Sequence, residues 1–244
     1  VAHEINNPIN GIMNYARLIA DKLPKEDPLR EYTSEIARET ERVTMIVKNL
    51  LQFARQEEHS RSPARMADIV NAVLSLTRMI IGRDRIALEV NVPENLPLVK
   101  CRNQQIQQVV MNLLTNARDA LNEKYPGPDE NKKIVIKAER VECGTRNAEC
   151  GRNTTVSDSE IPRSDFQLPI SYVRLTIEDH GTGIPPENIG RVFDPFFTTK
   201  PRAQGTGLGL AISHGIAKDH GGALTVESEF GNWSRFYVDL PMWE

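Results

Sequence analysis

The sequence predicts an α+β protein, in which a helical hairpin precedes a sandwich of helices packed on a mixed sheet. Two observations lead to this prediction. Over residues 2–56, apolar side chains recur at alternating steps of three and four, which is the spacing of a coiled-coil seam. Beyond residue 65, amphipathic helical segments are mixed with strands that alternate apolar and polar residues, as a sheet with one covered face requires.

The hairpin is predicted from two helical segments on either side of a turn. We expect the first helix over 2–23, with a seam formed by Ala2, Ile5, Ile9, Ile12, Ala16, Ile19 and Leu23. The segment 24–28 carries two prolines, which lack a backbone N–H and restrict the preceding residue, so the helix ends there. A second helix is expected over 29–56. One hairpin leaves its seam half covered, so we expect a homodimer through residues 2–56 that forms a four-helix bundle.

A polar segment with a proline, 57–65, separates the two halves of the chain. We therefore predict a first domain over 1–57, a linker over 58–64 and a second domain over 65–244. In the second domain we expect helices at 66–81, 102–123 and 207–219, and strands at 85–92, 133–142, 171–178, 222–229 and 234–240.

The composition narrows the classes of protein to consider. The net charge of −3 over 244 residues gives no reason to expect a nucleic-acid partner. No stretch approaches the roughly 18 apolar residues of a membrane span. Three cysteines cannot build a disulfide framework, although a pair between Cys143 and Cys150 stays open, and we expect reduced thiols. Residues 143–169 are polar, rich in turn formers and too long for an ordinary connection, so we interpret them as an insertion.

The first residues carry a histidine on the polar side of the predicted helix. With the seam isoleucines facing inward, His3, Glu4 and Asn7 point outward. A neutral imidazole is a good nucleophile near pH 7, and Glu4 can accept the Nδ1 proton and so expose Nε2. Asn7 lies one turn beyond His3 and can orient a water. The alternative interpretation is an ordinary solvated face of an amphipathic helix.

Two glycine clusters in the second domain predict a nucleotide pocket. Asp179 ends a predicted strand and enters the turn of Gly181 and Gly183; glycines allow close backbone approach, and a carboxylate can accept a hydrogen bond from an adenine amine. A second cluster opens a predicted helix, where backbone amides attract phosphates; it consists of Gly205, Thr206, Gly207, Leu208 and Gly209. No Lys-Ser/Thr pair follows, so it is not a Walker A loop.

Residues between and before these clusters complete the predicted pocket. After the aromatic run 193–197, the polar run 198–205 is typical of a hinged lid, from which Lys200 can meet phosphates. On the helix at 102–123, Asn112 and Asn116 lie one turn apart, and amide oxygens are suitable ligands for a Mg²⁺ ion that bridges phosphates. The alternative for both asparagines is a surface amide with no ligand.

Five motifs, at 3–8, 112–117, 179–185, 193–197 and 205–210, occur in this order. Together they resemble the H, N, G1, F and G2 boxes of the sensor histidine kinases of two-component signalling, over nearly the whole chain. The resemblance implies a dimerisation and phosphotransfer hairpin, truncated at its start, followed by an ATP-binding domain of the GHKL or Bergerat fold.

The resemblance also implies an activity and its residues. His3 would be autophosphorylated from ATP with Glu4 as its base, and the phosphoryl group would pass to an aspartate in the receiver domain of a response regulator. Asn7 corresponds to the amide used to dephosphorylate that regulator. Asn116, together with Asn112, would hold Mg²⁺, and Asp179 would recognise adenine. Ser234 stands where a threonine often lines the adenine pocket, and the glycines would shape pocket and lid.

The family's first helix extends upstream toward a sensor, so the resemblance implies a cytoplasmic portion of a longer protein that lacks its sensor domain. Two alternatives from other classes remain. One is an ATPase or serine kinase that shares the nucleotide fold. The other is a pseudokinase scaffold that binds nucleotide without turning it over.

Overall fold

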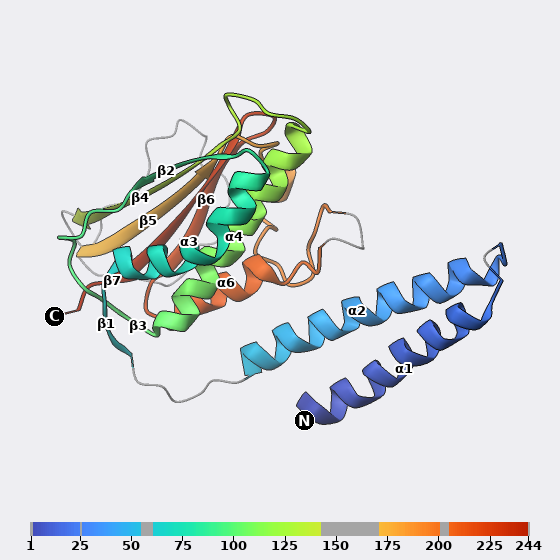
Figure 1. Ribbon diagram of the computed structural model, residues 1–244. Coiled ribbons are helices and arrows are strands. Elements are labelled where there is room, and N and C mark those ends of the chain that lie inside the picture. The colour runs from blue at the N-terminus through green and yellow to red at the C-terminus, as the bar shows by residue number, and fades with distance from the viewer. Residues whose placement is uncertain (1, 25, 55–60, 143–170, 201–204, 244) are drawn as a thin grey trace. The chain divides into compact units, whose positions relative to one another are not determined.

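The computed structural model describes residues 2–24, 26–54, 61–142, 171–200 and 205–243, with the backbone alone at 2–7, 41–42 and 45–54. The chain divides into two compact units. The first contains residues 1–58 and 194–209, and the second contains residues 59–193 and 210–244. Figure 1 shows the elements of each unit.

The first unit contains an antiparallel helical hairpin formed by α1 (Ala2–Lys22) and α2 (Leu29–Ala54) (Figure 1). Both helices match the predicted segments to within two residues at each end. The turn between them is held by polar contacts, because the Arg30 guanidinium donates to the Leu23 carbonyl over 2.9 Å and the Leu29 amide donates to Asp27 Oδ1 over 2.9 Å.

The predicted seam is half covered within one hairpin. Ile9 and Ala16 are buried against the facing helix. Leu23 is half-buried. Six further apolar positions keep 42–67% of their surface exposed; they are Ile12, Ile19, Leu29, Tyr32, Ile36 and Val43. Such a continuous apolar face is what a second hairpin would cover in a four-helix bundle.

The second unit is built on a five-stranded mixed sheet with the strand order β2-β4-β5-β7-β6. The strands are β2 (Ala87–Asn91), β4 (Lys133–Glu142), β5 (Ser171–Asp179), β6 (Ala223–Glu229) and β7 (Trp233–Pro241). The β2–β4 pair is parallel and the other pairs are antiparallel. Helices α3 (Met66–Arg83), α4 (Asn103–Lys124) and α6 (Gly209–Asp219) lie over one face of this sheet (Figure 1). The predicted α+β sandwich is confirmed.

The core lies between the helices and the sheet. An apolar stripe runs along α4, and all of its members are at most 3% exposed: Ile106, Val109, Val110, Leu113, Leu114, Ala117 and Leu121. On β5, Val173, Leu175 and Ile177 alternate with polar residues and are equally buried. Alternation with period two on the strand and period 3.6 on the helix brings these two faces together.

Three short elements were missed by the sequence analysis. Strand β1 (Ser62–Ala64) lies inside the predicted linker and pairs antiparallel with β3 (Val99–Cys101), and α5 (Pro186–Ile189) is a single turn. Elements of three or four residues are too short to show a hydrophobic period.

Several element boundaries differ from the prediction by one or two residues, and the backbone conformation explains two of them. The helix expected from residue 207 begins at Gly209, because Gly207 has φ +67°, which no right-handed helix accommodates. The strand expected from residue 85 begins at Ala87, because Arg85 adopts the left-handed region at φ 57°.

The structure describes one of the three cysteines and none of the predicted insertion. Cys101 is a buried free thiol, and burial raises its pKa to about 11. Cys143, Cys150 and the insertion at 143–169 lie outside the described residues. Among the helices that the structure describes, none is long and apolar enough to cross a membrane.

A buried ion pair joins β5 to β7. The Arg174 guanidinium donates to both carboxylate oxygens of Asp239, over 2.7 and 2.8 Å, and lies over the rings of Tyr172 and Tyr237. The side chains are 16% and 2% exposed, respectively. Burial raises the pKa of Asp239 above its ordinary value although Arg174 acts to lower it. Each charge therefore compensates the desolvation cost of the other, and removing one partner leaves the other charge buried without compensation.

This pair gives a prediction about stability. Asp239→Ala leaves the Arg174 charge largely buried without its carboxylate, and we expect it to lower the free energy of unfolding by about 3–5 kcal/mol. The matched control is Glu142→Ala, which removes the exposed partner of Arg140 and should change stability little. Chemical denaturation of both variants measures the difference, and equal effects would contradict the assignment.

Candidate functional site

Asp179 is the last residue of β5 and is only 3% exposed. In the sheet it stands opposite Ile134 on β4 and Ser234 on β7. The Gly181 amide donates to Asp179 Oδ1 over 2.9 Å, so the turn that follows the strand fixes the carboxylate. Asp179 thus lies at a strand end, as the sequence predicted, and the structure adds that its side chain is buried.

The surroundings of Asp179 set its protonation. Burial raises its pKa to about 7, and the neighbouring Glu178 charge acts in the same direction. The Gly181 amide and the Lys124 charge lower it. Near neutral pH the side chain is therefore divided between carboxyl and carboxylate. A ligand that presents an N–H donor would favour the carboxylate, because a hydrogen bond to the charged form stabilises it.

The turn after Asp179 needs glycine at both predicted positions. A Cβ on Gly181 would lie 2.7 Å from the Ala120 Cβ on α4. Gly183 has φ +66°, and a Cβ there would lie 2.2 Å from the Glu229 carbonyl oxygen. The Thr182 carbonyl accepts a hydrogen bond from the Gly231 amide over 2.7 Å. The 179–183 turn is therefore wedged between α4 and the turn that joins β6 to β7.

Ser234 takes part in a small hydroxyl cluster beside Asp179. Its side chain is buried and its Oγ lies 3.2 Å from Ser228 Oγ. Ser228 in turn accepts from the Ile184 amide over 2.8 Å and donates to the Trp233 carbonyl over 2.7 Å. This cluster connects the loop after the glycine turn to β6 and β7.

The two asparagines lie on α4, half-buried and one turn apart. The Asn112 amide group donates to the hydroxyl of Ser213 on α6 over 3.1 Å, which orients its carboxamide. In the described part of the chain, no group of three or more His, Cys, Asp or Glu side chains could hold a metal. Amide oxygens suit Mg²⁺, an ion that uses few protein ligands when phosphates supply the others. The residues therefore fit a magnesium ion that arrives with a nucleotide.

The glycine-rich cluster belongs to the first unit and has its own internal geometry. The Phe196 amide donates to the Gly207 carbonyl over 2.9 Å, and a Cβ on Gly207 would lie 2.4 Å from the Phe196 carbonyl carbon. Phe196 itself has φ 67° and is 59% exposed. A non-glycine residue in this region is strained, so the aromatic segment and the glycines hold one another in an unusual backbone.

Other predicted residues of this segment are placed by short contacts. The Lys200 amide donates to Thr198 Oγ1 over 3.2 Å, and Gly205 packs against the same hydroxyl. The Leu208 amide lies 3.4 Å from Thr206 Oγ1, and Gly209 begins α6. Residues 201–204 lie outside the described residues, so the mobility predicted for the lid at 198–205 stays a prediction.

His3, Glu4 and Asn7 lie within α1 (Ala2–Lys22), where the structure describes only their backbone. Their side chains are outside the part that the structure describes. The helical placement of the motif agrees with the sequence analysis, and its outward orientation stays a prediction.

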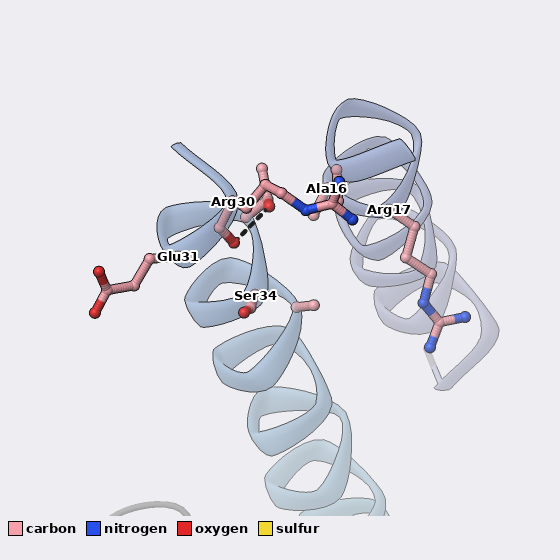
Figure 2. A pocket seen from close by; sticks show the side chains of 8 residues that line it. Ala16, Arg17, Arg30, Glu31 and Ser34 are labelled. Carbon is pink, nitrogen blue, oxygen red and sulfur yellow. Dashed lines mark hydrogen bonds between the residues drawn. The ribbon is translucent and has the colours of Figure 1, made fainter. Parts of the chain in front are cut away.

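A pocket of about 420 Å³ lies between α1 and α2 near the hairpin turn (Figure 2). It is lined by Ala16, Arg17, Ala20, Arg30, Glu31, Thr33, Ser34 and Ala37. Figure 2 shows Arg30 reaching from α2 to α1 beside Ala16, while Glu31 points away. Arg17 lies five residues after Ile12, which places it roughly 140° round the helix from that exposed seam residue.

Sequence reasoning missed Ser213, Ser228 and Lys124, which support the predicted residues. No sequence pattern distinguishes the two serines from ordinary polar positions on a helix and a strand. Lys124 had a weak signal, because a basic residue in the last turn of a helix interacts favourably with its dipole.

The chain matches two family models. A model described as histidine kinase-, DNA gyrase B- and HSP90-like ATPase matches residues 101–244, and a His Kinase A (phospho-acceptor) domain model matches residues 1–59.

Curated relatives match almost all of the chain. It is 31% identical over 241 residues to the sensor kinase CckA of Brucella abortus, covering 99% of this chain and 23% of that protein. It is 29% identical over 242 residues to the sensor histidine kinase ZraS of Salmonella typhimurium, covering 99% and 44%. It is 29% identical over 241 residues to the sensory histidine kinase/phosphatase NtrB of Rhizobium meliloti, covering 99% and 56%. The chain thus spans between about a quarter and about a half of these relatives.

Solved structures share the fold. Full-length ShkA in complex with AMPPNP matches with a TM-score of 0.63 at 23% identity, covering 99% of this chain and 44% of that one. The histidine kinase ThkA in complex with the response regulator protein TrrA matches with a TM-score of 0.59 at 26% identity, covering 98% and 60%.

The raised pKa of Asp179 predicts a pH-dependent stability. The folded-state pKa of Asp179, about 7, lies above the ordinary 3.8. At pH values between these two, the folded protein therefore keeps a proton on Asp179 that the unfolded chain has lost. The resulting stabilisation is full below about pH 3.8 and is lost as pH rises through about 7. We therefore expect the free energy of unfolding of the nucleotide-free protein, relative to Asp179→Asn, to fall between pH 5 and pH 8.

The control for this prediction is Asp84→Asn. A hydrogen bond from Asn122, together with Arg118, lowers the pKa of Asp84, so its contribution is lost only below about pH 3.8. The free energy of unfolding of Asp84→Asn, relative to the wild type, should stay constant between pH 5 and pH 8. A flat difference for Asp179 as well, measured by urea unfolding, would contradict the raised pKa.

Proposed function

Because the chain belongs to the sensor histidine kinases of two-component signalling, we propose that it phosphorylates its own His3 from ATP and passes the phosphoryl group to an aspartate of a response regulator. One observation supports this proposal above the others. A phospho-acceptor domain at 1–59 and an ATPase domain at 101–244 occur in one chain, so acceptor and donor sites are covalently joined. We propose domain limits of 1–57 and 65–244, with the linker at 58–64.

The chemistry at the acceptor is a phosphoryl transfer to nitrogen. Nε2 of His3 attacks the γ-phosphorus of ATP, an N–P bond forms, and the bond from phosphorus to the bridging oxygen breaks to release ADP. Glu4 accepts a hydrogen bond from Nδ1–H and stabilises the positive charge that grows on the ring. An aspartate of the regulator then attacks phosphorus and the N–P bond breaks. Asn7 orients a water when the regulator is dephosphorylated.

The nucleotide would be held by the elements around Asp179. Its carboxylate accepts a hydrogen bond from the adenine amine, and Ser234 lines the same end of the sheet. Gly181 and Gly183 would shape the pocket, because they let the turn after Asp179 pack against α4 and the Glu229 carbonyl. The support for this proposal is the burial of Asp179 next to a turn that excludes side chains at both glycines.

The phosphates would be met by the glycine-rich segment and by α4. Backbone amides at Gly205, Gly207 and Gly209, with Thr206 and Leu208 between them, face anionic groups in this role, and Lys200 adds a positive charge. Mg²⁺ would be held by the amide oxygen of Asn116, assisted by Asn112, and would supply charge neutralisation between the phosphates.

The hairpin would act as the dimer interface and as the contact for the regulator. The exposed apolar face at Ile12, Ile19 and Ile36 supports dimerisation through residues 2–56. The pocket beside Arg17 and Arg30, which Ala16 of the seam also lines, would offer the regulator a contact near the hairpin turn. Arg17 is fourteen residues from His3, or roughly 21 Å along the helix, a distance that a receiver domain can span. The likeness to a kinase solved with its regulator supports this partner.

The first test of the function is the acceptor residue. His3→Gln should abolish the acid-labile label taken up from γ-labelled ATP, while nucleotide affinity stays unchanged because the pocket lies in the other domain. Filter assays after acid and base treatment measure the label, since phosphohistidine is acid-labile and phosphoserine is acid-stable. Acid-stable label would favour a serine kinase, and a wild type that binds ATP without any label would favour a scaffold.

The second test concerns adenine recognition. Asp179→Asn should weaken ATP binding by about one to two decades, because a charge-assisted hydrogen bond is worth about 1.5–3 kcal/mol. GTP has a carbonyl where adenine has its amine, and it should bind the wild type weakly. Calorimetric titration of both nucleotides measures this. Equal affinities for ATP and GTP would remove Asp179 from base recognition.

The third test concerns magnesium. Asn116→Ala removes an amide ligand, so the Mg²⁺ concentration for half-maximal autophosphorylation should rise about tenfold or more. The matched control is Asn103→Ala, an exposed amide in the first turn of the same helix, which should leave the magnesium requirement unchanged. Identical magnesium curves for wild type and Asn116→Ala would exclude this ligand.

A further inference from the structure

The ammonium group of Lys124, the last residue of α4, joins three segments of the second unit. It donates to the carbonyl of His180 over 3.0 Å and to the carbonyl of Asn232 over 3.2 Å. It also lies 5.1 Å from the centre of the Tyr125 ring. One side chain thus connects the end of α4 with the turn after Asp179 and with the turn between β6 and β7.

These segments are already in close contact, so the lysine acts on a rigid arrangement. Gly181 touches Ala120 on α4, and Gly183 touches the Glu229 carbonyl. The Gly231 amide bonds the Thr182 carbonyl on the other side of the same turn. A shift at the end of α4 is therefore transmitted to the 179–183 turn, because there is no space for side chains to absorb it.

The charge of Lys124 matters as well as its hydrogen bonds. Around Asp179, burial and the Glu178 charge oppose ionisation, while the Gly181 amide and the Lys124 charge favour it. The residues opposite Asp179 in the sheet, Ile134 and Ser234, carry no charge. Glu178 is itself paired with Arg235 over 2.7 Å and with His180 over 3.2 Å.

We propose that Lys124 is a positioning residue of the nucleotide site: it holds the 179–183 turn against α4 and supplies the positive charge that lets the buried Asp179 accept a ligand hydrogen bond as a carboxylate. The inference rests on the proposed role of Asp179 in binding adenine. Helix α4 would then act at two parts of the nucleotide. Its asparagines would hold the magnesium ion at the phosphates, and Lys124 at its end would favour the charged form of the carboxyl group that binds the base.

The test compares pH profiles of ATP binding. Affinity scales with the fraction of protein in the competent, ionised form. Wild type should therefore tighten its binding as pH rises through about 7. If Lys124→Met moves the titration of Asp179 up by about one pH unit, ATP binding at pH 7 weakens about fivefold and the loss disappears by pH 9. Lys124→Arg keeps the charge and should restore most of the affinity.

Two further variants separate charge from structure. Lys124→Gln retains N–H donors without the charge and should resemble Lys124→Met in its pH profile. Lys132→Met is the matched control, because the Lys132 ammonium group donates to the Tyr125 carbonyl at the same helix end over 2.9 Å, and not to the His180 or Asn232 carbonyl. It should leave the profile unchanged apart from any loss of stability.

A direct reading of Asp179 makes the outcome independent of nucleotide binding. The ¹³C carboxyl resonance of Asp179, titrated in the nucleotide-free protein, should show a higher midpoint in Lys124→Met and Lys124→Gln than in wild type and Lys124→Arg. An unchanged midpoint, or a loss of affinity that is equal at pH 7 and pH 9, would overturn the proposal. If wild type and Asp179→Asn bind ATP alike, the proposed adenine contact fails, and the carboxyl titration still decides the role of Lys124.

Discussion

Asp179 lies at the end of β5 with 3% of its surface exposed, because the neighbouring elements pack around its carboxyl group. Its pKa of about 7 lies above the ordinary 3.8, because burial and the Glu178 charge, which disfavour ionisation, outweigh the Gly181 amide and the Lys124 charge, which favour it. A fully solvated carboxylate would form hydrogen bonds with water and gain little from a ligand. A fully isolated one would remain protonated and offer no charge. The balance leaves a side chain whose charged form a donor can select.

The close packing of the turn after Asp179 follows from the same requirement. Gly181 and Gly183 bring backbone against α4 and against the β6–β7 turn, where any side chain would collide. The hydroxyls of Ser228 and Ser234 satisfy polar groups that this packing removes from water. Because the same helix α4 carries Asn112 and Asn116, its position couples the base end and the phosphate end of the proposed nucleotide site. A small displacement of α4 would alter both ends together.

The two units of the chain use their apolar residues differently. The second unit buries its apolar stripe between helices and sheet, and it adds a buried ion pair, Arg174 with Asp239, on the strands themselves. The hairpin leaves much of its seam exposed, because two helices present more apolar surface than they can cover. The hairpin therefore offers an apolar face for association, whereas the described part of the second unit buries its apolar stripe within one chain. This difference suits the proposed roles: the proposed acceptor helix has to be presented to a partner, and the proposed nucleotide site has to keep its geometry.

The sequence by itself determined the helices and long strands, the apolar stripe of α4, and the identity of Asp179, Gly181 and Gly183, because hydrophobic period and glycine requirements are local properties. It did not determine β1, β3 or α5, which are too short to have a period, nor the start of α6, which depends on the left-handed backbone of Gly207. The contacts of Lys124 and Ser228 were decided only by tertiary structure. Both residues form hydrogen bonds with partners more than forty positions away in the sequence, His180 for Lys124 and Ile184 for Ser228. Partial burial strengthens these hydrogen bonds, and it exists only once the chain is folded.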